Sequence, residues 1–172
     1  MWDTVIDSLS NLEGSIVSTD PNRWDLETPG YTEIFKLWKQ ANYNANSIQW
    51  INYYPDIHYS KDIVTKLAEE LNLSHVHRSW ISRINPGYTA PWHWDVDDNE
   101  SEYLSHGHIT RYTVMMHDFS MGHIFILNDD YHIKCKKGDQ VFWDDHRSWH
   151  AGINAGLEPN YMFHILGVSR AS

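Results

Sequence analysis

The chain of 172 residues lacks several features that would have assigned it to a particular class of protein. Its single cysteine, Cys135, has no partner for a disulfide within the chain, so a reducing compartment is expected. Apolar runs are short, residues 124–127 being typical, whereas a membrane-spanning helix needs about 20 apolar residues. The N-terminal residues 1–20 include acidic residues but no Lys or Arg, unlike a signal peptide. We therefore expect a cytoplasmic protein that does not enter a membrane.

Positive charge is also scarce. The chain has 13 Lys and Arg against 23 Asp and Glu, which gives a net charge of -10 at pH 7. Non-specific binding to nucleic acid or to an anionic membrane needs clustered cations, so neither partner is expected. The sequence contains no repeat, low-complexity tract or linker, and its length is typical of one domain. We therefore treat residues 1–172 as a single domain.

The periodicity of apolar residues divides the chain into two parts. Residues 1–74 are expected to support the rest of the domain, with helices at 2–13, 32–41 and 60–71 and a strand at 47–54. Ser60 is suited to cap the third helix, and in the second helix Ile34, Leu37 and Trp38 are predicted to face inward. From residue 75 onward, short segments rich in β-branched and aromatic residues predict eight strands and an antiparallel sandwich or barrel. These strands are predicted at 75–84, 90–95, 108–118, 122–128, 131–136, 139–144, 149–154 and 161–169.

His93-Trp94-Asp95 and the distant His150 are the most informative residues of the chain. Side chains two residues apart in a strand project from the same face, so His93 and Asp95 should lie together. With one further imidazole they form a 2-His-1-carboxylate set, which leaves open positions on a metal and is typical of non-haem Fe(II) oxygenases. Both His146 and His150 follow the turn at Gly138, and either could supply the third ligand.

The residues around these ligands follow an ordered pattern. In chain order they are the Pro86-Gly87 turn, His93-Trp94-Asp95, a strand with Arg111, the Gly138-Asp139 turn, and His150 with Asn154. In this pattern the chain resembles the 2-oxoglutarate- and Fe(II)-dependent oxygenases, over residues 78–168. It is most similar to the aspartyl/asparaginyl β-hydroxylase-like and prolyl-4-hydroxylase-like branches. The resemblance implies a mainly β, cupin-like fold, the double-stranded β-helix or jelly roll, with the N-terminal helices as support.

The resemblance also implies roles for individual residues. His93, Asp95 and His150 would bind Fe(II), His150 being preferred because it stands where the family has its distal histidine. The cosubstrate 2-oxoglutarate would need a cation for its far carboxylate, preferably an arginine. Many relatives place that arginine on the last strand, but residues 157–166 contain none. Other branches take it from the strand after the His-x-Asp motif, where Arg111 lies.

Arg111 is therefore the predicted anchor, because a buried arginine on a strand face needs an anionic partner. The alternative is that Arg111 is a surface residue near a strand end. The other arginines that could serve instead are Arg83, Arg147 and Arg170. Further candidates for cosubstrate binding are His117, Asn154 and Tyr161.

The implied reaction consumes O₂ and 2-oxoglutarate, releases succinate and CO₂, and hydroxylates a C–H bond. Halogenating relatives lack the carboxylate ligand, so the presence of Asp95 favours hydroxylation. Both branches favour a peptidyl residue, so a peptide or amino-acid substrate is expected beside the small-molecule cosubstrate. Acidic residues at 95–102 raise the hypothesis of a cationic substrate, although an ordinary solvated loop explains them more simply.

Two other classes of function fit part of the pattern. Zn²⁺ also accepts two histidines and one aspartate with water as fourth ligand, which would suit a metal-dependent hydrolase. No motif for a general base or an oxyanion stabiliser accompanies the ligands, so the hydrolase ranks lower. The third class is a non-catalytic jelly-roll module, although simple ligand binding does not require these three residues.

Overall fold

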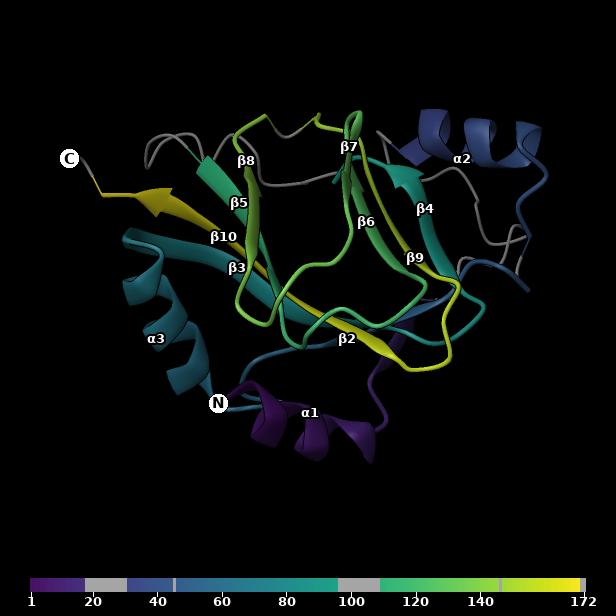
Figure 1. The fold of residues 1–172 in the computed structure, drawn as a ribbon. Coiled ribbons are helices and arrows are strands. Elements are labelled where there is room, and N and C mark those ends of the chain that lie inside the picture. The colour runs from purple at the N-terminus through teal and green to yellow at the C-terminus, as the bar shows by residue number, and fades with distance from the viewer. Residues whose placement is uncertain (18–30, 45, 96–108, 146, 171–172) are drawn as a thin grey trace.

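A computed structural model describes residues 1–17, 31–44, 46–95, 109–145 and 147–170 of the chain. Within them, two antiparallel sheets face each other, and helices lie on their outer sides (Figure 1). None of the described helices has the length and apolar character needed to cross a membrane.

The larger sheet has six strands and the smaller sheet has four. In spatial order the larger sheet contains β1 (Ser15–Val17), β2 (Trp50–Tyr53), β3 (Leu73–Ile84), β10 (Asn160–Ser169), β5 (Ile109–Met115) and β8 (Gln140–Trp143). The smaller sheet contains β4 (Thr89–His93), β9 (His150–Asn154), β6 (His123–Leu127) and β7 (Asp130–His132). From β3 onward the chain passes repeatedly between the two sheets, so that β10 lies between β3 and β5 while β9 lies between β4 and β6. This strand order is that of a double-stranded β-helix, and the predicted fold class is confirmed.

All eight strands predicted after residue 75 are present, with ends that differ by a few residues. The largest difference is at β7, which was predicted to run to residue 136 but ends at His132. Lys134 adopts a left-handed backbone conformation with φ of 59°, which a strand cannot contain. The three-residue strand β1, which pairs with β2, was not predicted.

The three described helices are α1 (Trp2–Ser10), α2 (Tyr31–Gln40) and α3 (Lys61–Glu70). Ser60 caps α3 as predicted, because its hydroxyl accepts a hydrogen bond from the backbone N–H of Asp62 at 3.2 Å. The prediction for Leu37 was wrong, since its side chain is 41% exposed. The helix α2 packs into the protein through Ile34 and Trp38, with Phe35 partly buried beside them, and Leu37 lies outside this contact.

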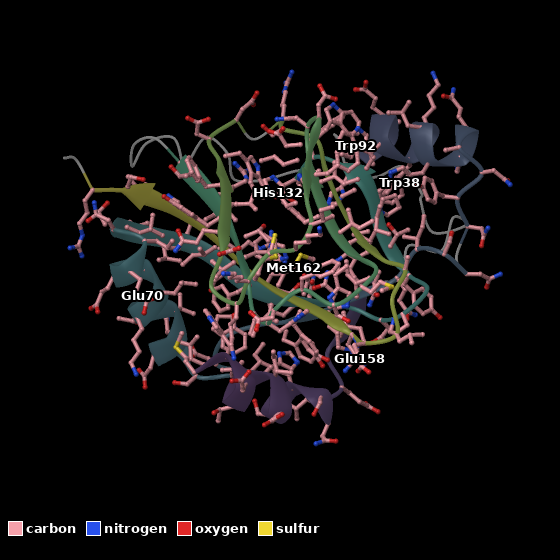
Figure 2. The ribbon with its side chains drawn as sticks, in the orientation of Figure 1. Trp38, Glu70, Trp92, His132, Glu158 and Met162 are labelled. Atoms are coloured by element: carbon pink, nitrogen blue, oxygen red, sulfur yellow. The ribbon has the colours of Figure 1, made fainter. Side chains whose placement is uncertain are left out.

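The buried apolar residues form three clusters. The outer face of the larger sheet packs against α1 and α3 through residues such as Leu9, Leu67 and Phe163. The space between the sheets is filled by residues that include Met115 and Met162, and Met162 lies near the centre of the molecule in Figure 2. The third cluster lies under α2. Each fully buried Leu, Met or Phe side chain in these clusters stabilises the fold by about 1.5–3 kcal/mol.

Side-chain alternation along β5 determines what faces the space between the sheets. Val114 belongs to the outer cluster and Met115 to the inner one. Arg111 and Thr113 share the face of Met115, because side chains two residues apart in a strand point the same way. Both are buried, with exposed fractions of 3% and 0%. The charged side chain of Arg111 and the polar side chain of Thr113 therefore lie inside the barrel.

Candidate metal centre

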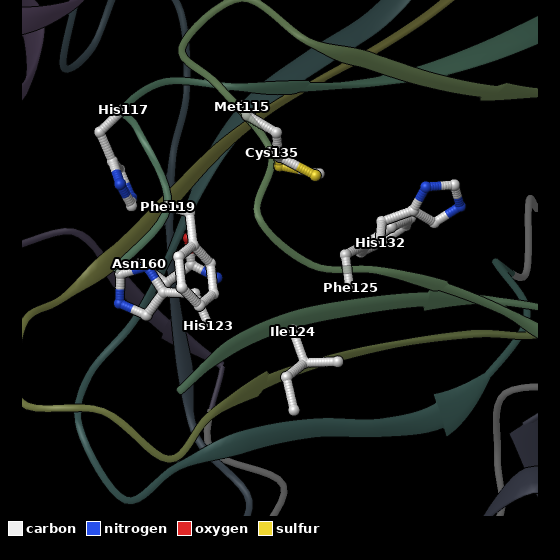
Figure 3. A pocket seen from close by; sticks show the side chains of 9 residues that line it. All are labelled: Met115, His117, Phe119, His123, Ile124, Phe125, His132, Cys135 and Asn160. Carbon is white, nitrogen blue, oxygen red and sulfur yellow. The ribbon is translucent and has the colours of Figure 1, made fainter. Parts of the chain in front are cut away.

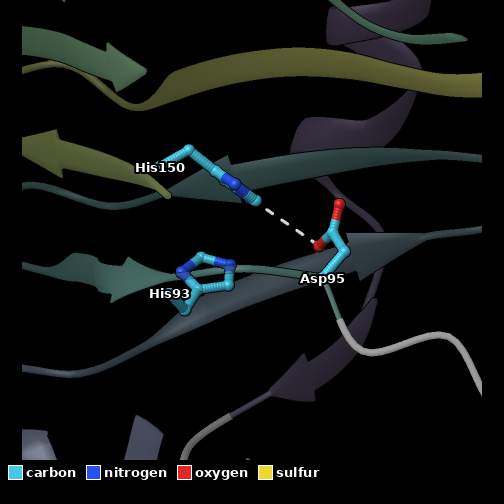
Figure 4. A group of neighbouring side chains, drawn as sticks. All are labelled: His93, Asp95 and His150. Carbon is cyan, nitrogen blue, oxygen red and sulfur yellow. Dashed lines mark ion pairs between the residues drawn. The ribbon is translucent and has the colours of Figure 1, made fainter. Parts of the chain in front are cut away.

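The predicted ligands His93, Asp95 and His150 lie together inside the barrel (Figure 4). His93 ends β4, His150 begins β9, and these two residues are paired directly across the two strands. Asp95 follows two residues after His93, beyond the end of the strand but on the same side. One ligand atom from each residue lies within 4.8 Å of the others, and the described residues contain no other such group of three or more.

Backbone carbonyls fix the orientation of both imidazoles. His93 Nδ1 lies 2.5 Å from the carbonyl oxygen of Pro91, and His150 Nδ1 lies 3.1 Å from that of Ser148. A carbonyl oxygen only accepts hydrogen bonds, so each Nδ1 carries a proton, and in the neutral form of each ring Nε2 keeps its lone pair. Metal-binding histidines are held in this way, with the nitrogen that does not bind the metal donating to a carbonyl or carboxylate.

The protonation states also suit a metal. Burial, reinforced by repulsion from His150, lowers the pKa of His93 to about 4, so this imidazole is neutral in neutral solution. Burial acts to raise the pKa of Asp95, but the neighbouring His150, His93 and Arg111 outweigh it and hold that pKa below its usual range. A neutral imidazole and an ionised carboxylate are the forms that bind metals.

The distances agree with a shared ion. Asp95 Oδ1 lies 3.6 Å from His150 Nε2, which is too long for a hydrogen bond. Two atoms that each lie about 2 Å from one ion are at most about 4 Å apart, so this pair can bind the same ion. The donor set of two imidazoles and one carboxylate fits Fe(II) with open positions, and it also fits Zn²⁺.

Aromatic rings surround the two imidazoles. Trp50 stacks on His93 with ring centroids 6.2 Å apart, and Trp143 packs on His150 at 5.1 Å. Trp38 reaches the same strand from α2 by donating a hydrogen bond of 2.7 Å from Nε1 to the carbonyl oxygen of Trp92 (Figure 2). This packing restricts the rings and keeps bulk water away from them.

Arg111 contacts the centre through Asp95. Its Nε lies 3.6 Å from Asp95 Oδ2, so the two carboxylate oxygens face different partners, one His150 and the other Arg111. The Arg111 side chain is only 4% exposed. A guanidinium this deeply buried is costly unless anions lie beside it. The structure therefore excludes the alternative that Arg111 is a surface residue.

His164 is a half-buried polar residue beside this centre that was not among the predicted site residues. Its Nε2 lies 2.7 Å from Ser82 Oγ and its Nδ1 lies 3.0 Å from Thr113 Oγ1, and this chain of contacts crosses β3, β10 and β5. Its ring stacks on Trp80 at 4.9 Å. Burial lowers the pKa of His164 to about 3, and the charge of Asp95 only partly opposes the shift. His164 is therefore neutral.

A signal for His164 was present in the sequence. It is the only polar side chain between Tyr161 and Val168, in an otherwise apolar strand. It also falls in residues 157–166, where an arginine was sought and not found. A polar residue in a buried strand requires polar partners, and pairing with Ser82 and Thr113 supplies them.

The other predicted binding residues make contacts elsewhere. Asn154 Nδ2 donates to the carbonyl oxygens of Ile84 and Glu158, both at 2.8 Å, and so closes a turn. Tyr161 is 4% exposed and belongs to the outer cluster. His117 Nε2 accepts a hydrogen bond of 3.0 Å from the backbone N–H of Tyr161. A role in cosubstrate binding stays a prediction for these three residues.

The remaining candidates are not brought to the triad by any described contact. Arg83 acts electrostatically on Tyr53 in the outer cluster, and Arg147 and Arg170 are exposed. His146 and the acidic residues at 96–102 lie outside the described residues.

Comparison with known proteins adds a general likeness. No family model matches the chain, and no curated protein matches it. Similar solved structures include a predicted oxalate decarboxylase from Thermotoga maritima (TM-score 0.43, 12% identity, 70% of this chain and 81% of that chain). Another is the cupin domain of an XRE-family transcriptional regulator from Enterobacter cloacae (TM-score 0.41, 11% identity, 70% of this chain and 98% of that chain).

A third is a non-haem monooxygenase in complex with nickel (TM-score 0.43, 15% identity), where the alignment covers 62% of this chain and 49% of that chain. Proteins with one fold can carry unrelated activities. The assignment of the double-stranded β-helix therefore depends on the strand order, and the function has to be argued from the residues of the site.

Proposed function

We propose that this protein is an Fe(II)- and 2-oxoglutarate-dependent oxygenase that hydroxylates a C–H bond. The main support is the pair of imidazoles whose Nε2 lone pairs are directed, together with an ionised Asp95, at one place inside the barrel. The buried Arg111 beside them adds a cation that a simple structural metal site would not need.

His93, Asp95 and His150 would hold the iron. When bound, Fe(II) supplies the activation of O₂ and the oxidative decarboxylation of 2-oxoglutarate, with release of succinate and CO₂. Three protein ligands leave positions free for cosubstrate and oxygen. The carbonyl oxygens of Pro91 and Ser148 keep the imidazoles in the tautomer that presents Nε2.

Arg111 would have two tasks. Through Nε it steadies the carboxylate of Asp95, and the rest of its planar guanidinium is suited to a second carboxylate, that of the cosubstrate. Thr113 and His164 lie on the same inner face and could donate or accept one further hydrogen bond each if the cosubstrate replaced their mutual contact. A neutral His164 suits this place because it adds no second positive charge.

The primary substrate is proposed to be a peptidyl residue or an amino acid. This part of the proposal follows from the likeness to the two hydroxylase branches and from the ordered motif that carries it. The presence of Asp95 as a carboxylate ligand favours hydroxylation over halogenation.

The test is 2-oxoglutarate turnover by the purified full chain, measured as succinate release with and without Fe(II). We expect turnover that needs Fe(II) and O₂ together and that rises when an accepted peptide is added. Tight Zn²⁺ binding with hydrolysis by water as the sole co-reactant would instead support a hydrolase. Failure to bind either metal or 2-oxoglutarate would support a non-catalytic module.

A further inference from the structure

A second arginine lies on the inner face of the larger sheet, two strands away from Arg111. Leu166 of β10 is paired with Arg111 on β5 at one side and with Arg78 on β3 at the other. Residues that are paired across strands have side chains on the same face of the sheet. Neighbouring strands are about 4.8 Å apart, so the backbones of the two arginines are separated by roughly 10 Å.

Contacts along β3 confirm that Arg78 faces inward. The pairing of β3 with β10 is regular from residue 78 to residue 84, so Arg78, Trp80 and Ser82 share one face. Ser82 contacts His164, and Trp80 stacks on the same imidazole with ring centroids 4.9 Å apart. The guanidinium carbon of Arg78 lies 5.2 Å from the centre of the Trp80 ring. These contacts lead from Arg78 through Trp80 to His164, beside the metal centre.

The outer end of this series of contacts is accessible. Arg78 is exposed and Trp80 is half-buried, whereas Ser82, further in, is buried. The strands β3 and β10, with 12 and 10 residues, extend beyond the strands of the smaller sheet (Figure 1). A guanidinium that lies over an aromatic ring is held through its face, while the N–H donors at its edge stay available to an anion. Among the described residues, no carboxylate forms an ion pair with Arg78.

We propose that Arg78 binds a carboxylate of the primary substrate, which is a peptide with Asp or Glu near the residue that is hydroxylated. This inference rests on the proposed function, because it takes the metal centre as the place of reaction. A planar guanidinium binds a carboxylate through two parallel hydrogen bonds, and the Trp80 ring offers an apolar surface beside it. Arg111 adjoins the centre, and a separation of roughly 10 Å corresponds to about three residues of an extended peptide. The acidic residue is therefore expected two or three positions from the hydroxylated one.

This charge is opposite to the one that the acidic residues at 95–102 suggested for the substrate. Of these residues, those at 96–102 lie outside the described part of the chain. Asp95 lies between His150 and Arg111, so its charge serves the metal centre. Arg78, by contrast, has a defined place on the inner face and an accessible side chain.

The probes are three pools of nonapeptides with every amino acid at the central position. The residues two and three positions from the centre are Glu in the first pool, Gln in the second and Lys in the third. Binding of fluorescein-labelled pools to the full chain is measured by fluorescence anisotropy, and turnover is measured as Fe(II)-dependent succinate release. We expect the Glu pool to bind about tenfold more tightly than the Gln pool, the ratio given by one charge-assisted hydrogen bond. The Glu pool should also raise succinate release most.

Charge reversal tests the protein side. Arg78→Glu should reverse the order, so that the Lys pool binds more tightly than the Glu pool. Arg78→Lys keeps the charge without the planar fork and should give an intermediate preference. Lys66→Glu is the matched control, because Lys66 is exposed on α3, which packs on the opposite face of the sheet, and it should leave the order unchanged. Circular dichroism shows whether the variants fold.

The two assays separate this inference from the proposed function. Equal binding of the Glu and Lys pools, tighter binding of the Lys pool by the natural chain, or an order that Arg78→Glu leaves unchanged would each overturn the inference. Fe(II)-dependent succinate release that no pool alters would overturn it as well, while the proposed function would stand. No succinate release under any condition would overturn the proposed function, and the role of Arg78 in substrate binding with it.

Discussion

Two of the pairs of neighbouring histidines, His93 with His150 and His117 with His123, differ in what their nitrogens face. The ring centroids of His93 and His150 are 4.3 Å apart, and those of His117 and His123 are 5.0 Å apart. In the first pair both Nδ1 atoms contact backbone carbonyls and Asp95 lies beside the two Nε2 atoms. In the second pair, His117 uses one nitrogen for the carbonyl of Asp118 and the other for a backbone N–H.

Among the described residues, no carboxylate is grouped with the second pair in the way that Asp95 is grouped with the first. The pocket beside it has a volume of about 20 Å³, room for about one water molecule, and its lining includes Met115, Phe119 and Cys135 (Figure 3). Burial lowers the pKa of His123 and raises the pKa of the Cys135 thiol, so both groups stay neutral. Two close imidazoles are therefore not sufficient for a metal centre. The first pair differs because both of its imidazoles direct an Nε2 atom to the same place and because an ionised carboxylate lies beside them.

The largest effect that would sharpen this comparison is expected from Asp95→Asn. The amide keeps the shape but removes the negative charge that faces both imidazoles and Arg111. We expect Fe(II) affinity and succinate release to fall by more than the 10–100-fold typical of groups one layer further from a metal. Metal affinity is measured by anaerobic calorimetry. An enzyme with undiminished turnover would contradict the assignment of Asp95 as a ligand.

A smaller and more selective effect is expected from Arg111→Gln. Loss of a charge-assisted hydrogen bond of about 1.5–3 kcal/mol should raise the Kd for 2-oxoglutarate by roughly ten- to a hundredfold. Fe(II) binding should persist, because all three ligands remain. Arg147→Gln, at an exposed arginine, is the matched control and should change neither constant. Equal loss of iron and cosubstrate binding would show that Arg111 only supports Asp95.

The pH dependence of stability tests whether His164 is buried in its neutral form. Its folded pKa of about 3 lies below the ordinary value near 6.5, so between these values the unfolded chain binds more protons. The free energy of unfolding should therefore fall as the pH is lowered through this window, by up to about 1.4 kcal/mol per pH unit for each such group.

His93, with a pKa of about 4, acts in the same direction. Urea unfolding of metal-free protein between pH 7 and pH 5 should show a shallower dependence for His164→Asn than for the natural chain. An unchanged dependence would mean that His164 titrates normally.

The smallest effect on the metal centre is expected from His123→Asn in the second pair. It removes the hydrogen bond between Nε2 and the carbonyl of Glu158 and should lower the free energy of unfolding by about 1 kcal/mol. Fe(II) affinity should equal that of the natural chain. A loss of iron binding in this variant would break the distinction between the two pairs.

Sequence reasoning succeeded where the signal is local. The His-x-Asp spacing at the end of β4, the cap at Ser60 and the turn at Gly138, whose φ is 92°, each depend on a few neighbouring residues. The strand order also followed, but only through a family resemblance, because pairing such as β3 with β10 joins residues far apart in the chain.

The features that the sequence could not show depend on the register between strands that are distant in the chain. His164 lies opposite Trp80 and Thr113 only in the observed pairing of β10 with β3 and β5. The same holds for the pairing of β2 with β3, which involves only residues 81–83 of β3. Likewise β1 has three residues and too little periodicity to recognise.

The most direct test of the central claim is a crystal structure of the full chain after anaerobic addition of Fe(II) and 2-oxoglutarate, with anomalous scattering measured at the iron edge. The account predicts one iron peak bound by Nε2 of His93, a carboxylate oxygen of Asp95 and Nε2 of His150. An iron peak at any other group of residues, or none at saturating Fe(II), would contradict it.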